Sequence, residues 1–139
     1  MHGGSQLRKR LVVLDQALLD RPGEFRRILV HELFHFVWLR ISYAVRLSYE
    51  ALLQRELAVG ARGELGWSAE MRKAGLTAED AADRSRRWRE YACESFCDTA
   101  AWLYSGLRAH EEFTLKPRFR RLRRRWWAAR IAVRESLRV

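Results

Sequence analysis

The sequence is poor in cysteine and has no long apolar run, and each absence excludes a class of protein. Its two cysteines, Cys93 and Cys97, are too few for a disulfide framework and fit a reducing, cytoplasmic environment. No apolar run is long enough to cross a bilayer, and the first residues lack the apolar segment of a signal peptide. We therefore expect a cytoplasmic protein without a membrane partner.

Internal repeats and low-complexity linkers are also absent, so the 139 residues are expected to form a single domain. Hydrophobic residues make up 48% of the chain, which is enough for a packed core and too many for a disordered protein. Residues 1–6 are set aside as a flexible start or a cloning remnant. That leaves residues 7–139 as the domain.

The patterning predicts a mainly α fold with one or two short strands. Residues 7–15 have the β-branched, apolar character of a strand. Asp20 and Pro22 are typical of a helix start, with the aspartate as cap and the proline in the first turn. From Glu24 the spacing of apolar residues stays helical past Tyr43.

The middle of the chain alternates between helical and glycine-rich segments. A second helix, or a continuation of the first, is predicted over about 47–59. Residues 60–76 contain four glycines and are expected to form a long loop or small hairpin. Thr77 and Asp80 form a capping-box pattern, and the helix that follows is predicted to run to about Tyr104.

The segment HELFH carries the strongest chemical signal. His31 and His35 lie four residues apart, so on a helix they share one face and can direct both imidazoles at one ion. Glu32 follows His31 by about 100° around the helix, which places it beside such an ion as a general base for the attacking water. This is the arrangement of HExxH zinc hydrolases.

A catalytic zinc site needs a third protein ligand. A metzincin would place a histidine at position 41 and a glycine at 38, whereas this chain has Ile41 and Trp38. The acidic cluster of the apolar helical segment REYACESFCDTAAWLY offers a carboxylate instead. Glu94 would bind zinc, and Asp98, one turn later, would accept the free N–H of a ligating histidine and fix its tautomer.

Two other ligand assignments stay open at this point. Glu90 precedes Glu94 by one turn, but the residue four positions after it is Glu94 rather than an aspartate, so Glu94 is preferred. Cys93 or Cys97 would give a His2Cys site as in deformylase-like enzymes, which carry their cysteine before HExxH. We expect both cysteines to be small buried apolar residues.

These two motifs resemble those of the gluzincin metallopeptidases, the thermolysin-like clan, which combine HExxH on one helix with ExxxD on a later one. HELFH and ESFCD both fit, and the resemblance is to a minimal member of the clan. It implies a zincin-like domain and peptide-bond hydrolysis. It also implies that His31, His35 and Glu94 bind Zn²⁺, that Glu32 is the base and that Asp98 supports a ligand.

Stabilising the oxyanion of such a reaction takes a tyrosine, histidine or arginine. The candidates in this chain are Tyr91 and Tyr104, which flank the expected ligand helix, and His110, the one spare histidine outside the start of the chain. Each of them has an alternative interpretation as a packed or solvent-exposed side chain. A peptide or protein is the expected substrate.

The balance of charge suggests a second class of function. The chain has 27 basic and 17 acidic residues, and residues 116–138 form an arginine-rich segment that begins a helix at Pro117. Arginines interleaved with Phe119, Trp126 and Trp127 are typical of binding to nucleic acid or another acidic surface, with a structural or inactive zinc site. The helical apolar spacing favours packing instead, and Trp127, which lies off that stripe, is predicted to be exposed.

Overall fold

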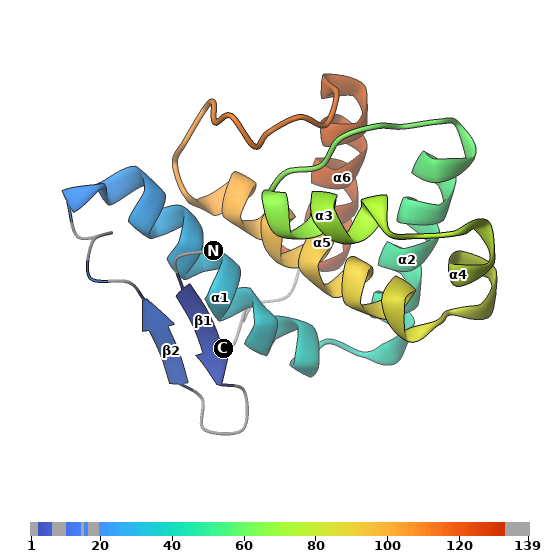
Figure 1. Cartoon of the computed structure of the whole chain (residues 1–139), viewed down its shortest axis with the longest axis horizontal. Helices are drawn as coiled ribbons and strands as arrows, with labels where there is room; N and C mark the ends of the chain where they lie inside the picture. Colours follow the sequence, from blue (N-terminus) through green and yellow to red (C-terminus); the bar gives the residue numbers. More distant parts are fainter. Residues whose placement is uncertain (1–2, 7–10, 15, 17–19, 133–139) are drawn as a thin grey trace.

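The computed structural model is built mainly of α-helices (Figure 1) and describes residues 3–6, 11–14, 16 and 20–132. A short hairpin precedes the helices. Within the described residues the helices are α1 (Pro22–Arg40), α2 (Tyr43–Ala58), α3 (Trp67–Ala74), α4 (Ala78–Asp83), α5 (Arg86–Tyr104) and α6 (Pro117–Arg130). None of these helices is both long enough and apolar enough to span a membrane.

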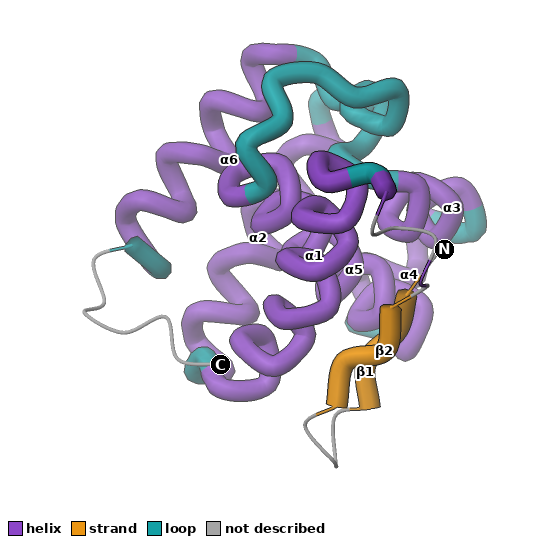
Figure 2. Tube along the Cα trace, turned by 90° about the vertical axis from the view of Figure 1, so that its left-hand side faces the viewer, coloured by secondary structure: helices purple, strands orange, loops and turns teal. Residues whose placement is uncertain are grey.

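The hairpin consists of strands β1 (Gly3–Gln6) and β2 (Leu11–Leu14), paired antiparallel with Gly3 opposite Leu14. It lies beside α1 (Figures 1 and 2). β2 falls within the segment 7–15, for which the sequence predicts a strand, while residues 7–10 and 15 lie outside the described part. β1 lies within residues 1–6, for which the sequence predicts a flexible start or a cloning remnant.

Of the two alternatives for residues 47–59, a second helix is found, and the first helix does not continue past Tyr43. α1 ends at Arg40, and Ile41 has an extended backbone. The side chain of Ser42 then accepts the backbone N–H of Val45 at 3.2 Å and caps α2. A serine N-cap therefore overrides an apolar spacing that would allow the helix to continue.

Two predicted helix starts can be compared with the structure. α1 does begin at Pro22, but Arg21 rather than Asp20 occupies the N-cap position, and it makes no side-chain cap. The capping box at the start of α4 is confirmed, because the Asp80 carboxylate accepts the backbone N–H of Thr77 at 2.7 Å.

The helix predicted from Thr77 to Tyr104 is interrupted once. Arg84 adopts a left-handed backbone with φ 46°, and the hydroxyl of Ser85 accepts the N–H of Trp88 at 3.2 Å. These two residues end α4 and begin α5, although the predicted end at Tyr104 holds. The loop predicted over 60–76 is also interrupted, by the eight residues of α3.

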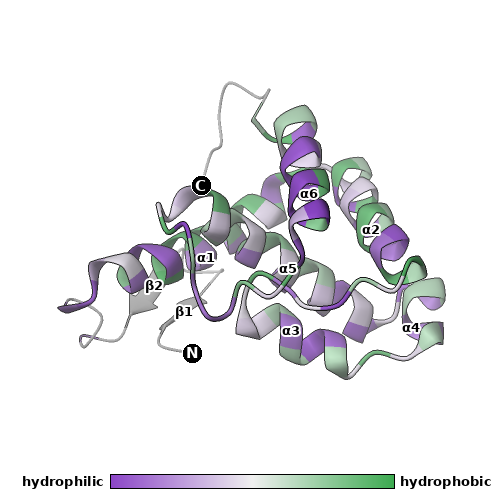
Figure 3. Ribbon diagram, turned by 90° about the horizontal axis from the view of Figure 1, so that it is seen from above, coloured by the Kyte–Doolittle hydropathy of each residue, from purple (hydrophilic) through white to green (hydrophobic). Residues whose placement is uncertain are grey.

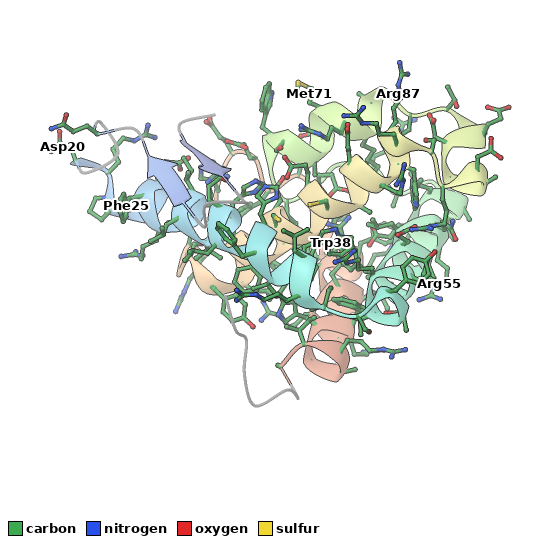
Figure 4. All side chains as sticks on the ribbon, turned by 90° about the horizontal axis from the view of Figure 1, so that it is seen from below. Asp20, Phe25, Trp38, Arg55, Met71 and Arg87 are labelled. Atoms are coloured by element: carbon green, nitrogen blue, oxygen red, sulfur yellow. The ribbon has the colours of Figure 1, made fainter. Side chains whose placement is uncertain are left out.

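The main core is largely aromatic and lies between α1, α2, α5 and α6. Its large rings pack in edge-to-face, tilted and stacked pairs, and they come from Phe34, Trp38, Tyr49, Phe96, Trp126 and Trp127. Figure 4 shows Trp38 among the packed helices and Met71 and Arg87 at the outside of the molecule. α1 and α5 pack along each other through this core, and α3 packs on α5.

Candidate metal centre

The two histidines of HELFH project from the same side of α1. Their ring centroids are 5.1 Å apart, and His31 is 5% exposed. Glu32 is 1% exposed, and one ligand atom from each of these three residues lies within 4.8 Å of the others. The helix therefore places all three side chains at one buried point.

Glu94 reaches this point from α5. Its Oε2 lies 3.1 Å from Nε2 of His35 and 3.5 Å from Nε2 of His31. We call these three residues, His31, His35 and Glu94, the two-histidine cluster. Two motifs separated by about sixty residues thus meet because α1 and α5 pack along each other.

Asp98 supports the cluster from the next turn of α5. Its Oδ1 lies 2.7 Å from Nδ1 of His31, and its Oδ2 accepts the backbone N–H of Ala69 at 3.0 Å. If Nδ1 of His31 carries the proton and donates it to this carboxylate, the lone pair of Nε2 is left facing Glu94. Asp98 therefore lies where a partner that fixes the histidine tautomer is needed.

Helix α3 holds both carboxylates, although the sequence predicts a loop or small hairpin over residues 60–76. Ser68 donates its hydroxyl to Oε1 of Glu94 at 3.0 Å. A Cβ at Gly66 would lie 2.3 Å from Cγ of Asp98, so only glycine allows α3 to approach so closely. The available signal was Gly66 followed by Ser68 and then by Glu70, an acidic residue in the first turn.

Three buried polar atoms remain without a hydrogen bond among the described residues: Nε2 of His31, Oε1 of Glu32 and Oε2 of Glu94. Buried polar groups are rarely left unpaired in this way. Four ligands placed tetrahedrally at 2.0–2.1 Å from zinc are about 3.3 Å apart. The contacts of 3.1 and 3.5 Å in the cluster match that spacing, so its donor atoms fit a zinc ion.

The electrostatics of the cluster also favour a cation. Burial alone would lower the pKa of His31, but the carboxylates of Asp98 and Glu94 raise it to about 10. Burial would raise the pKa of Glu94, but the adjacent imidazoles of His31 and His35 hold it well below its usual range. The carboxylates therefore draw positive charge to this point, whether it arrives as protons or as a metal ion.

Family models, curated proteins and solved structures gave no match to this chain. The resemblance to gluzincins therefore stays a prediction from two short motifs. What the structure adds is their convergence, because residues from α1 and α5 surround one point and α3 secures the carboxylates.

Cys93 lies next to the cluster. Its Sγ is 3.6 Å from Nδ1 of His35, on the side of the ring away from Glu94, and Cys97 is buried one turn further along. Ligand atoms of His35, Cys93, Glu94 and Cys97 also lie within 4.8 Å of one another. Cys93 thus contacts Nδ1 of His35, as Asp98 contacts Nδ1 of His31.

Two of the other predicted site residues lie away from the cluster. Glu90 is on the outer side of α5, where it forms an exposed ion pair with Arg86 at 2.9 Å. Tyr91 is fully buried, and its hydroxyl donates to the carboxylate of Glu64. The structure therefore brings Glu94 rather than Glu90 to the histidines, and it does not direct Tyr91 toward them.

The remaining oxyanion candidates differ in position. The hydroxyl of Tyr104 accepts the indole N–H of Trp127 at 2.9 Å, and its ring stacks on Phe34 in the core. His110 lines the cavity beside His31, but it contacts Glu24 through Nε2 at 2.8 Å and accepts a backbone N–H at Nδ1. Of the three predicted candidates, only His110 shares a cavity with the cluster.

Helix α6 packs differently from its predicted pattern. Phe119 and Trp126 are buried as the spacing indicates, but Leu122 is 42% exposed. Trp127, predicted to be exposed, is 2% exposed and donates to Tyr104. The prediction of an exposed tryptophan contact is therefore wrong. Positions 133 and 137 of the predicted stripe lie outside the described residues.

A second buried polar group, which we call the arginine cluster, consists of Arg123, Glu56 and Glu64. The Arg123 side chain has no exposed surface and makes two hydrogen bonds to each carboxylate, at 2.8–2.9 Å. It also donates to the hydroxyl of Thr99 at 3.2 Å. One arginine of the segment predicted to bind a partner thus ties α6 to α2 and to the loop before α3.

Proposed function

We propose that this chain is a zinc-dependent peptidase with a minimal zincin-like domain, in which the two-histidine cluster binds the metal. The observation that carries the proposal is the set of three buried, unpartnered atoms on His31, Glu32 and Glu94. Nε2 of His31 and Oε2 of Glu94 face each other at 3.5 Å without a hydrogen bond, which is the spacing of two ligands of one ion. A hydrolytic site needs them free for an ion and for a water.

The residues around the ion have separate roles in this proposal. His31, His35 and Glu94 would hold zinc, which when bound supplies Lewis acidity toward the substrate carbonyl and the attacking water. Asp98 accepts the Nδ1 proton of His31 and so keeps Nε2 available as a ligand. Ser68 occupies the other oxygen of Glu94, which leaves Oε2 for the ion.

Glu32 is the proposed general base. Its carboxylate is buried beside the ligands and borders the cavity, so it can take a proton from the attacking water and pass it to the leaving amine. Zinc binding does not require this residue. The base and the ligand set can therefore be tested separately.

The test compares wild type with Glu32→Gln and Glu79→Gln, each loaded with one zinc, on a diverse peptide mixture read by mass spectrometry. Glutamine keeps the shape of the side chain but cannot accept the proton at neutral pH. We expect Glu32→Gln to keep its zinc and to lose about 10²–10⁴-fold in cleavage rate. Glu79 is exposed on α4, so its variant should match wild type.

Equal cleavage by wild type and Glu32→Gln would contradict the proposed base. Zinc-loaded wild type that leaves the whole mixture intact would contradict the assignment as a general peptidase.

A second candidate function is binding to an anionic surface through α6. Among the described residues, six acidic but only two basic side chains are buried. The surface therefore carries a larger excess of basic residues than the whole chain does. Hydrophilic residues follow much of α6 in Figure 3. Five of its arginines are exposed: Arg118, Arg121, Arg124, Arg125 and Arg130.

If these arginines contact phosphates, affinity for a nucleic-acid duplex should fall steeply as salt is raised. Replacing Arg121 and Arg125 by glutamine should flatten that slope. A duplex that does not bind at low salt would exclude this second function.

A further inference from the structure

A cavity of about 180 Å³ opens beside the two-histidine cluster and runs along the first half of α1. Glu24, Ile28 and His31 follow one another along one side of that helix and line it, and the loop between α5 and α6 closes the far side. Pockets for drug-sized ligands are larger, at about 300–1,000 Å³. The space therefore suits one side chain better than a whole ligand.

Carboxylates dominate the far end of this cavity. Glu24, Glu111 and Glu112 all line it, in a protein whose formal net charge is +10. The one buried base there, Arg27, forms an ion pair with Glu24 and another with Glu112, the latter at 3.2 Å. Two carboxylates thus surround one guanidinium, which leaves negative charge in excess.

His110 is held between these groups. Its Nδ1 accepts the backbone N–H of Glu112 at 3.0 Å, and its Nε2 lies 2.8 Å from a carboxylate oxygen of Glu24. Burial would raise the pKa of Glu24, but Arg27 and His110 lower it to about 2, so that carboxylate stays ionised.

The rim of the cavity carries one residue of each sign. Arg21 and Glu111 are both exposed, and neither forms an ion pair among the described residues.

A second observation, besides the acidic lining, points to a ligand in this space. Glu32 lines the same cavity, is 1% exposed, and has an oxygen without a hydrogen-bond partner. Acidic residues that line a surface cavity are common and do not by themselves indicate a ligand. Here the acidic lining continues to the buried carboxylate of Glu32, beside the two-histidine cluster, and this favours a binding site.

We propose that the cavity binds a long cationic side chain, arginine or lysine, of the peptide held at the two-histidine cluster. Glu24 precedes His31 by seven residues, which is about 10 Å along the helix axis. Only a long side chain whose backbone lies at the metal reaches the excess carboxylates. Glu111, with no ion pair among the described residues, is the carboxylate at the rim that is free to meet its charged end.

A carboxylate ligand fits this cavity less well. It would have to displace Glu24 or Glu112 from Arg27, whose charge both of them already neutralise. The inference thus deepens the proposed peptidase function and rests on it, because the substrate backbone must be held at the metal.

The experiment measures binding to zinc-loaded protein by calorimetry with three N-acetylated amino-acid hydroxamates. The hydroxamate group binds zinc in all three, while the side chain is that of arginine, of citrulline or of glutamate. Arginine and citrulline have the same length and shape and differ in charge. We expect the arginine compound to bind about tenfold more tightly than the citrulline compound, as one charge-assisted contact would give.

The variant Glu111→Gln should reduce this preference at least about threefold, and Glu79→Gln should leave it unchanged. Equal affinity for the arginine and citrulline compounds would overturn the cationic site while leaving the metal site intact. Tighter binding of the glutamate compound would assign the cavity to a carboxylate and overturn it too. If zinc-loaded protein binds none of the three compounds, the zinc ion has no free coordination position. That result would contradict both the proposed peptidase function and the cationic site.

Discussion

The molecule contains two buried charged groups on different faces of α5, and they differ in one respect. In the arginine cluster every charged side chain has its partners, since Arg123 bonds both Glu56 and Glu64 twice. In the two-histidine cluster, Oε2 of Glu94 lies 3.1 and 3.5 Å from the two imidazoles, but neither this atom nor Nε2 of His31 makes a hydrogen bond. A buried polar atom without a hydrogen bond lowers the stability of the fold by about 1–3 kcal/mol, and binding of a ligand to that atom offsets the loss. The first cluster is therefore structural, and the second is a candidate site.

The largest expected effect comes from breaking the complete cluster. Arg123→Leu would leave Glu56 and Glu64 buried without their partner, and the free energy of unfolding should fall by about 3–5 kcal/mol. Arg125→Leu, on the exposed side of the same helix, should change it by less than about 0.5 kcal/mol. Urea denaturation measures both. If the two variants are equally stable, the arginine cluster does not stabilise the fold.

The incomplete cluster should instead respond to metal. Zinc at about 100 times its dissociation constant should stabilise wild type by about 2.7 kcal/mol, with one ion bound per chain. Glu94→Gln should lose both the ion and this stabilisation. Glu90→Gln should keep them, because Glu90 is paired with Arg86 on the outer side of α5. Thermal denaturation with and without a chelator, together with elemental analysis, gives the result. The reverse order of the two variants would move the ligand to Glu90.

A smaller effect should follow from disturbing the contact between α3 and Asp98. Gly66→Ala places a methyl group against that carboxylate, which should destabilise the protein by about 1–3 kcal/mol. It should also weaken zinc binding by about 10–100-fold, as loss of support to a ligand does. Gly75→Ala is the control, because its added Cβ would meet its nearest atom at 3.6 Å. Unchanged zinc affinity in Gly66→Ala would show that α3 does not support the site.

The two clusters also differ in how far the sequence predicts them. His31, Glu32 and His35 are fixed relative to each other by helix geometry, and so are Glu94 and Asp98, because four residues make about one turn. Their pattern was visible without a structure. The packing of α1 against α5, which brings the two groups together, could be expected only from the gluzincin resemblance. No local property of the sequence predicts that contact.

The arginine cluster was not predictable for the same reason. Arg123 lies in an arginine-rich segment, and nothing near it marks one arginine as buried, because its partners Glu56 and Glu64 are about sixty residues away. α3 was missed because four glycines dominated its segment, although one of them, Gly66, serves close packing rather than a turn. The break at Ser42 was a local signal, but the apolar spacing across it concealed the cap.

One consequence follows from α5 carrying contacts to both clusters. Glu94 and Asp98 contact the histidines. Ser95 and Thr99, each one position further along, contact Glu64 and Arg123 of the arginine cluster at 3.3 and 3.2 Å. Turning the helix by a single residue, about 100°, would remove every one of these contacts at once. Contacts to both clusters thus fix the rotation of α5 about its axis. They favour the native arrangement over compact alternatives that bury the same apolar surface.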